Sequence, residues 1–289
     1  MFNGADILKR IRREKPLIHH ITNNVTIGDC ADITMSIGAL PVMAPTKEEV
    51  EEMVSSARGA VINIGTLYPA QVEAMLAMGK KARAEDIPVV LDPVGAGATS
   101  YRTETSRLII REAKPALIKG NNAEIMSLAG VKKPRISGVQ SLEEDADPLP
   151  GALGLLKTLD YGAVVAVTGP VDLLTDGRRV ARVRNGHWLL PLVVGSGCMA
   201  ASLVASFAAV EKDHFMAATA ALVAMGVAGE IAAGGRETAG DGETVVNRET
   251  AGDEGASFLG PAEFKRRLLD ALFFLTPEEL DRRARVEIQ

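Results

Sequence analysis

The chain is 289 residues long, which is enough for one large α/β domain or for two smaller domains with separate cores. Apolar residues make up 47% and aromatic residues only 4%, a balance that favours close packing of helices on a sheet over an all-β sandwich. The formal net charge of −5 comes from interspersed acidic and basic residues, so neither nucleic acid nor an anionic membrane is an expected partner.

Cysteine content and the N-terminal region indicate the compartment. Cys30 and Cys198 are too few for a disulfide framework, so a reducing compartment is expected. Residues 1–15 carry charges every few positions and lack the apolar core of a signal peptide, and no apolar run suggests a membrane span. We therefore expect a cytoplasmic protein that does not cross a membrane.

The N-terminal region predicts two helices around a polar cluster. Residues 6–14 form an amphipathic helical pattern that ends at a proline, and a second helical run follows the cluster. The adjacent histidines His19 and His20 lack the spacing of metal ligands and are interpreted as structural. Asn23 and Asn24 precede the second helix, where a helix cap is the simpler interpretation and a ligand contact is the alternative.

Short apolar runs alternate with helical patterns after Gly38, which is typical of repeated β-α-β units and a parallel sheet. The turn pair Asp176-Gly177 lies between two extended runs and predicts a small hairpin at the edge of the sheet. We expect residues 1–289 to form a single α/β domain, with a mostly parallel central sheet and helices on both of its faces. The predicted strands are residues 40–44, 60–64, 88–91, 116–119 and 163–167.

Several helix starts carry sequence signals. Thr46 with Glu49 and Thr276 with Glu279 match the capping box, in which the N-cap and N3 side chains bond each other's backbone amides. Pro69 suits a first helical position. These signals predict helices that begin close to residues 46, 69 and 276.

The stretch Gly195-Ser196-Gly197-Cys198 is the strongest local indication of chemistry. A β-rich segment, residues 189–194, precedes it, and a helix of small residues follows it. Glycines at the first turn of a helix leave N–H groups exposed, and with the helix dipole they form a site suited to phosphate. A helix N-terminus also increases the thiolate fraction of a cysteine, so Cys198 is a candidate proton acceptor beside phosphate. On this stretch alone, a small buried cysteine is the simpler interpretation.

Polar residues follow the ends of the predicted strands. Because ligands of parallel sheets bind at the carboxyl ends of strands, we expect these residues to share one pocket. Any one of them could be a helix cap, but caps do not require lysine, aspartate and glutamate at successive strand ends. In chain order the strand ends carry Met43, Gly65-Thr66, Asp92, Lys119 with Glu124, Thr168 and Cys198.

Taken in order, these motifs resemble the hydroxyethylthiazole kinase family over nearly the whole chain, from about Leu17 to the C-terminal helices. The Asn-Asn-Val and Gly-Cys elements are the most specific, whereas Asp-Pro-Val and Asn-x-x-Glu are shared with the wider ribokinase-like superfamily. The matching motifs are Ile21-Thr22-Asn23-Asn24-Val25, Pro41-Val42-Met43, Asn63-Ile64-Gly65-Thr66-Leu67, Leu91-Asp92-Pro93-Val94-Gly95-Ala96-Gly97-Ala98, Lys119-Gly120-Asn121-Asn122-Ala123-Glu124-Ile125, Thr168-Gly169 and Gly195-Ser196-Gly197-Cys198.

The resemblance implies a ribokinase-like fold and the phosphorylation of 4-methyl-5-(2-hydroxyethyl)thiazole by ATP with Mg²⁺, a salvage step towards thiamine phosphate. It also implies a homotrimer with active sites at subunit boundaries. By position, Asp92 and Glu124 organise Mg²⁺, and Cys198 stands where most ribokinase-like kinases have an aspartate base. The implied thiazole contacts are Asn23, Met43 and Gly195, and the implied ATP contacts are Lys119, Thr168 and Gly197.

Three positions depart from the family pattern. Val194 stands where many relatives have threonine, Lys119 where the family often has arginine, and Asp32 where asparagine is expected. The ammonium group of lysine is a compact point charge, whereas the guanidinium group of arginine can bind a phosphate through two parallel N–H donors. These departures bear on nucleotide alignment and rate rather than on the reaction.

Three other functions remain as alternatives. One is an ATP-dependent dehydratase that repairs hydrated NAD(P)H and is built on the same superfamily fold, and another is a hydroxymethylpyrimidine phosphate kinase. Both are expected to carry aspartate at the position of Cys198. A non-catalytic thiazole- or nucleotide-binding protein would need no base. Release of ADP with each candidate substrate separates these alternatives.

A near-duplication with a period of twelve residues precedes the last helices. Residues 236–241 and 248–253 both read Arg-Glu-Thr-Ala-Gly-Asp, a repeat too short and isolated for a solenoid. Its polar, glycine-rich composition predicts an extended surface loop, with a cover over the nucleotide as the less favoured alternative.

Overall fold

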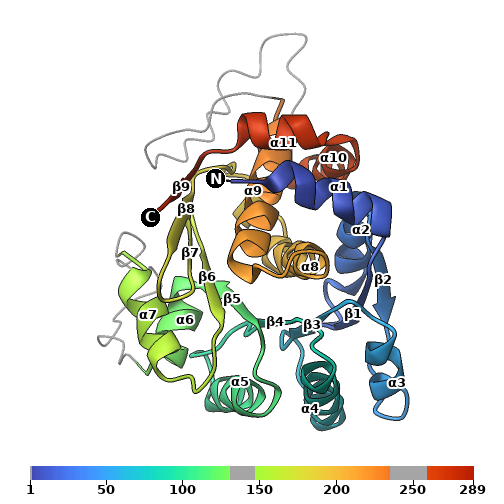
Figure 1. The fold of residues 1–289 in the computed structure, drawn as a ribbon, viewed down its shortest axis with the longest axis vertical. Helices are drawn as coiled ribbons and strands as arrows, with labels where there is room; N and C mark the ends of the chain where they lie inside the picture. The colour runs from blue at the N-terminus through green and yellow to red at the C-terminus, as the bar shows by residue number, and fades with distance from the viewer. Residues whose placement is uncertain (1, 131–146, 235–258) are drawn as a thin grey trace.

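The structure is a computed structural model that describes residues 2–130, 147–234 and 259–289 (Figure 1). The duplicated segment of residues 236–253 lies outside the described residues. Within the described ranges, nine strands form one sheet in the order β2-β1-β3-β4-β5-β6-β7-β8-β9. The strands are β1 (Leu17–Ile21), β2 (Leu40–Met43), β3 (Gly59–Asn63), β4 (Val89–Asp92), β5 (Leu117–Asn121), β6 (Val164–Thr168), β7 (Asp172–Thr175), β8 (Val180–Val183) and β9 (Val286–Ile288).

Strand direction is uniform from β1 to β6 and then alternates from β6 through β9. Strands β1 to β6 pair in parallel, so their carboxyl ends meet at one edge. The β7–β8 hairpin adds to β6 in the antiparallel direction, and the C-terminal strand β9 pairs outside it. The predicted mostly parallel sheet and its hairpin are thus confirmed, although β9 and not the hairpin forms the outermost edge.

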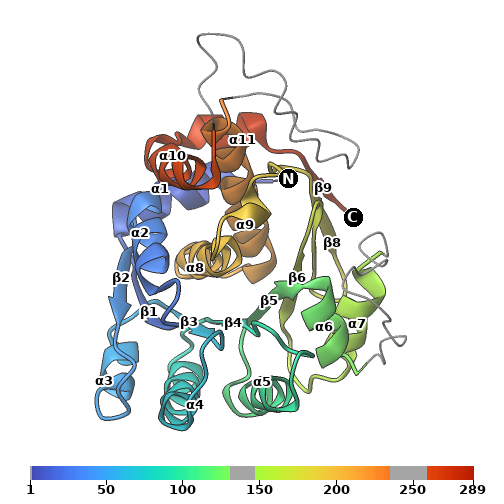
Figure 2. The ribbon, with the colours of Figure 1, turned by 180° about the vertical axis from the view of Figure 1, so that it is seen from behind.

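Helices cover both faces of the sheet, and the sheet curves around α8 and α9, as the view from behind also shows (Figure 2). One hydrophobic core lies between the sheet and α1, α2, α8, α9, α10 and α11, and the other lies against α3 to α7. The helices are α1 (Gly4–Glu14), α2 (Ile27–Ile37), α3 (Val50–Ser55), α4 (Pro69–Ala84), α5 (Ser100–Ala113), α6 (Asn122–Leu128), α7 (Leu149–Lys157), α8 (Ser196–Ala208), α9 (His214–Ala232), α10 (Pro261–Phe274) and α11 (Pro277–Arg283).

Helix α9 is apolar enough and, at 19 residues, long enough to cross a membrane by composition alone. The expectation that no apolar run has the length of a membrane span is therefore wrong for residues 214–232. In the structure, 83% of its apolar window is buried inside the protein, where it packs against α8 and α10. Its hydrophobicity on all sides is that of a central core helix.

Two sequence predictions about local structure are wrong, and one strand was not predicted. Residues 189–194 form no strand; they contain the 3-10 turn Leu190–Leu192 and link β8 to α8. Pro191 has no N–H, so it could not donate a hydrogen bond to a neighbouring strand. Strand β1 was not predicted, because two histidines interrupt its apolar pattern. Thr46 caps no helix, since α3 begins at Val50 after a turn and has no side-chain cap.

The cap at Thr276 is confirmed only in part. Its side chain accepts a hydrogen bond from the N–H of Glu279, and Pro277 begins α11 as expected. The Glu279 carboxylate, however, bonds to Arg283 one turn later instead of returning to the cap. A complete capping box occurs elsewhere, at the start of α6.

Candidate active site

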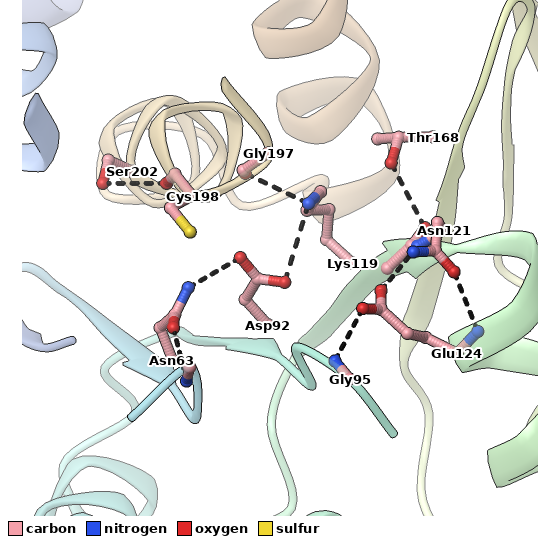
Figure 3. A network of polar contacts seen from close by, with 12 residues as sticks. Asn63, Asp92, Gly95, Lys119, Asn121, Glu124, Thr168, Gly197, Cys198 and Ser202 are labelled. Atoms are coloured by element: carbon pink, nitrogen blue, oxygen red, sulfur yellow. Dashed lines mark hydrogen bonds and ion pairs between the residues drawn. The ribbon is translucent and has the colours of Figure 1, made fainter. Parts of the chain in front are cut away.

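The alternation of side chains along the strands gathers three polar residues on the α8 face of the sheet. Asn63 and Asp92 are direct partners at the ends of β3 and β4. The β4–β5 register pairs Leu91 with Ile118, which places Lys119 beside Asp92. Because successive strand residues point to opposite faces, all three side chains point towards α8 (Figure 3).

Asp92 and Lys119 form a buried ion pair. The Lys119 Nζ lies 3.6 Å from the Asp92 Oδ1, and both side chains are almost fully shielded from solvent. Burial raises the pKa of Asp92 to about 6, although Lys119 acts against this shift. Burial by itself lowers the pKa of Lys119, but the carboxylates of Asp92 and Glu124 raise it above its ordinary value, so the ammonium stays charged.

The N-terminus of α8 faces this ion pair. Gly195 caps the helix with φ +85°, and a Cβ there would lie 2.4 Å from a methyl carbon of Thr26, so only glycine fits. The Lys119 Nζ donates to the Gly197 carbonyl at 3.0 Å. Among the described residues, the N–H groups of Gly197 and Cys198 have no acceptor, as expected for a first helical turn. They form an anion site next to an ammonium group.

Cys198 joins this group through two asparagine side chains. The Asn23 Nδ2 donates to the Cys198 Sγ at 3.3 Å and to the Asn63 Oδ1 at 3.0 Å. The Asn63 Nδ2 in turn donates to the Asp92 Oδ2 at 2.8 Å. The structure therefore brings the predicted residues Asn23, Asp92, Lys119 and Cys198 together, and it adds Asn63.

Glu124 serves the backbone as well as the site. One carboxylate oxygen accepts from the N–H of Asn121, which completes the capping box of α6, and the other accepts from the N–H of Gly95 at 2.8 Å. The sequence argument that capping could not explain the acidic residues is thus wrong for Glu124. The same bonds fix its carboxylate at the edge of the site.

The other predicted residues lie at the same sheet edge but farther apart. Met43 ends β2, which is two strands from β3, and Thr168 ends β6, which is two strands from β4. With strands about 4.8 Å apart, each lies roughly 10 Å from the centre of the site. The Thr168 Oγ1 donates to the Gly120 carbonyl at 3.4 Å.

Asp172 is a further carboxyl group at this edge, and the sequence analysis did not single it out. Its Oδ1 accepts from the N–H of Gly169 at 3.0 Å, which holds the turn after β6. Burial raises its pKa above the ordinary range, against the effect of Lys119. Its position four residues after Thr168 was the only available signal.

The geometry can be compared with known proteins. Residues 8–278 match the model of the hydroxyethylthiazole kinase family. The chain belongs to this family. A relative named hydroxyethylthiazole kinase from Thermoanaerobacter pseudethanolicus is 48% identical over 98% of this chain and 99% of that protein. A relative of the same name from Methanocella arvoryzae is 45% identical over 96% of this chain and 94% of that protein.

Solved structures confirm the ribokinase-like fold. A structure of hydroxyethylthiazole kinase protein from Pyrococcus horikoshii matches with a TM-score of 0.80 and 35% identity, covering 99% of this chain and 98% of that one. Pyridoxal kinase from Staphylococcus aureus, in complex with AMP-PCP, matches with a TM-score of 0.53 over 72% of this chain and 85% of that one. At 15% identity, this second likeness shows the fold alone.

In this member of the hydroxyethylthiazole kinase family, a buried histidine supports the helix that carries Cys198. The His20 Nε2 lies 3.2 Å from the Ser202 Oγ, and Ser202 donates to the Cys198 carbonyl at 3.3 Å. Its Nδ1 lies 3.0 Å from the Ile18 carbonyl. The interpretation of His20 as structural agrees with these contacts, and the described residues contain no metal-ligand cluster of three or more His, Cys, Asp or Glu side chains.

Replacement of His20 by glutamine should make stability less sensitive to acid. Burial lowers the pKa of His20 from 6.5 to about 4, so below pH 6.5 the unfolded chain binds a proton that the folded chain rejects. Wild-type stability should fall between pH 7 and pH 4, and by pH 5 this group accounts for about 2 kcal/mol. Urea unfolding of both proteins at pH 8 and pH 5 measures the difference. An equal loss in both would show that His20 does not titrate in this range.

Proposed function

We propose that this chain transfers the γ-phosphoryl group of ATP to the hydroxyl of 4-methyl-5-(2-hydroxyethyl)thiazole. The observation that carries the proposal is the meeting of the Asp92–Lys119 pair with Cys198 at the first turn of α8. The family match over residues 8–278 supports the thiazole alcohol as the acceptor.

The phosphate side of the site neutralises negative charge. An ammonium group has three N–H donors; Lys119 donates one to the Gly197 carbonyl and lies 3.6 Å from the Asp92 Oδ1, so a donor remains for a phosphate oxygen. The N–H groups of Gly197 and Cys198 add fixed dipoles at the end of a 13-residue helix. Such preorganised donors stabilise the charge that develops on the transferring phosphoryl group.

The acceptor side aligns the alcohol and takes its proton. The hydroxyl oxygen forms a bond to the γ-phosphorus, the bond from that phosphorus to the β–γ bridging oxygen breaks, and ADP leaves. Cys198 acts as a thiolate: the proton of the hydroxyl passes to its Sγ, which becomes a thiol. Asn23, which donates to this sulfur, keeps it in place for the transfer.

The acidic residues fit a magnesium ion. Mg²⁺ prefers oxygen ligands and is commonly held by one or two carboxylates together with substrate phosphates and water. Asp92 and Glu124 supply two such carboxylates beside the helix that receives the phosphates. Bound there, Mg²⁺ would supply positive charge to the β- and γ-phosphates. Both carboxylates are buried and held by hydrogen bonds, so they would present oxygen atoms at fixed positions.

We further propose a homotrimer whose subunits complete the acceptor side. Val25 and Val194 are exposed by 68% and 69%, although they lie within two residues of Asn23 and Gly195. Two surface hollows, of about 340 and 250 Å³, lie at α5 and α10 and not beside Cys198, so neither of them provides the acceptor side of the site. Exposed apolar side chains beside the site support cover by a second subunit. Light scattering that gives a monomer mass at micromolar concentration would contradict the trimer.

Location in the cytoplasm belongs to the same proposal. Cys30 and Cys198 are both free thiols in the interior, which suits a reducing compartment. We propose that residues 1–289 act there as one catalytic domain.

Measurement of ADP release tests the function. ATP and Mg²⁺ with the thiazole alcohol should give ADP and the thiazole phosphate in equal amounts. Hydroxymethylpyrimidine phosphate and hydrated NADH should give rates at least about 10²-fold lower, because the site would leave their extra polar groups without partners. A faster reaction with either compound would reassign the enzyme.

A further inference from the structure

Asn63 occupies the centre of the polar network. Its side chain is 1% exposed and ends β3 directly beside Asp92. The Nδ2 donates to the Asp92 Oδ2 at 2.8 Å, and the Oδ1 accepts from the Asn23 Nδ2 and from the N–H of Gly65. Figure 3 shows Asn63 beside Asp92, with both side chains facing the helix that carries Cys198.

The direction of every bond at Asn63 is fixed by its neighbours. A carboxylate only accepts, so Asp92 requires a donor from Asn63. The Asn23 Oδ1 already accepts from Thr26 through its backbone N–H and its hydroxyl, so Asn23 offers its Nδ2 to Asn63 and Cys198. Asn63 must therefore donate on one side and accept on the other.

Of the side chains of this size, only a primary amide meets both demands. Aspartate keeps the acceptor but loses the donor at pH 7, and alanine loses both. A hydroxyl is shorter and has one proton. The neighbours of Asn63 thus select the chemistry of the side chain as well as its volume.

We propose that Asn63 is a positioning residue that couples the two halves of the phosphoryl-transfer site. Through Asn23 it places the alcohol and the Cys198 thiol, and through Asp92 it fixes the carboxylate next to Lys119. This inference rests on the proposed function. The Asn63 amide bonds to Asn23, Gly65 and Asp92, so we assign its effect on catalysis to Asn23 and Asp92 and not to a contact of its own with substrate.

Two substitutions separate the two ends of the Asn63 side chain. Asn63→Asp keeps the acceptor for Asn23 but places a carboxylate against Asp92, so the affinity for thiazole should stay within about threefold of wild type. Its kcat should fall about 10- to 100-fold, as for other changes to the partners of metal-organising carboxylates. Asn63→Ala should lose kcat and also bind thiazole about three- to tenfold more weakly, since Asn23 loses its acceptor.

Calorimetry of thiazole binding without nucleotide or metal measures the affinity of each variant for thiazole. Steady-state kinetics measures kcat and KM. Thr175→Ala is a matched control, because Thr175 is fully buried, bonds to the N–H of Gly177, and pairs with Val165 near the start of β6, away from the site. It should lower stability without changing kcat or thiazole affinity.

The outcomes are distinct. If both Asn63 variants behave like Thr175→Ala, with lower stability and unchanged kcat, Asn63 only supports the fold and the inference is wrong. If Asn63→Asp weakens thiazole binding as much as Asn63→Ala does, the two ends are not separable and the coupling role is also wrong. A wild-type protein that forms no ADP with the thiazole would remove the proposed function itself, and the inference with it.

Discussion

Replacement of Cys198 by alanine should lower kcat by about 10²- to 10³-fold and raise KM for the thiazole far less. General base catalysis contributes on this scale, and the substitution removes the proton acceptor while the N–H groups of the first turn of α8 remain. Coupled ADP release at saturating ATP and Mg²⁺ measures both constants. An alanine variant with unchanged kcat would remove the base from the mechanism.

Two further substitutions show whether the loss of kcat in Cys198→Ala comes from lost proton transfer or from altered packing. Cys198→Asp should preserve or improve turnover, because a carboxylate is a proton acceptor and can receive the same hydrogen bond from Asn23. Cys30→Ala is the matched control: this second buried cysteine lies on α2, where burial raises the pKa of its thiol, and the variant should keep kcat within about twofold. Loss of activity in the Cys30 variant would point to packing rather than proton transfer.

The parallel sheet was predictable because buried parallel strands have a strong sequence signature. Four of the five predicted strands overlap continuous apolar runs whose side chains fill the two cores, and the fifth, β2, is partly exposed at the edge. Strand β1 was missed because its histidines look polar. In the fold, the His19 Nε2 lies 2.8 Å from the Ala44 carbonyl, so the cost of burying a polar ring is offset by a bond that only the tertiary structure provides.

The segment before α8 shows how packing overrides strand propensity. Leu189 and Val193 are buried in the core while Leu192 and Val194 face solvent, a spacing of four rather than two. Pro191 removes an N–H that a ladder would need. The apolar run predicted burial, but it could not predict whether these residues would pair with a neighbouring strand.

The site was predictable in part because strand ends in a parallel sheet converge. Asp92, Lys119 and Cys198 were expected to meet on that basis, and they do. The link through Asn63 was not assigned, since the pairing of β3 with β4 sets its contact with Asp92 and no sequence pattern gives that register. The capping box at Glu124 was missed because its cap is asparagine rather than serine or threonine.

Replacement of Lys119 by methionine should abolish most activity and destabilise the fold. The substitution leaves Asp92 as a buried charge without its ion-pair partner, which costs about 3–5 kcal/mol in comparable sites. It also removes the ammonium group from the phosphate site, so kcat should fall by at least about 10²-fold. Urea unfolding and ADP release measure the two effects on the same preparation.

A second substitution separates the two losses. Lys119→Met combined with Asp92→Asn removes both partners of the closest ion pair, so most of the lost stability should return, because replacing both partners of a buried pair is far less costly than removing one. Activity should not return. Lys47→Met is the matched surface control: its partner Glu73 lies 2.8 Å away but both side chains are exposed, and the melting temperature should not change measurably.

Lys119→Arg tests whether charge or shape matters at this position. Arginine keeps the positive charge beside Asp92, so stability should stay close to wild type. A Cβ on Gly197 would lie 3.1 Å from the Lys119 Nζ, so the space beside this nitrogen exists because residue 197 has no side chain. The larger guanidinium of arginine would have to fit into that space. If kcat is close to wild type in Lys119→Arg but stays low in the Lys119→Met, Asp92→Asn double variant, the loss of kcat is due to loss of the positive charge. Full activity in Lys119→Met would show that the helix N-terminus alone holds the phosphates.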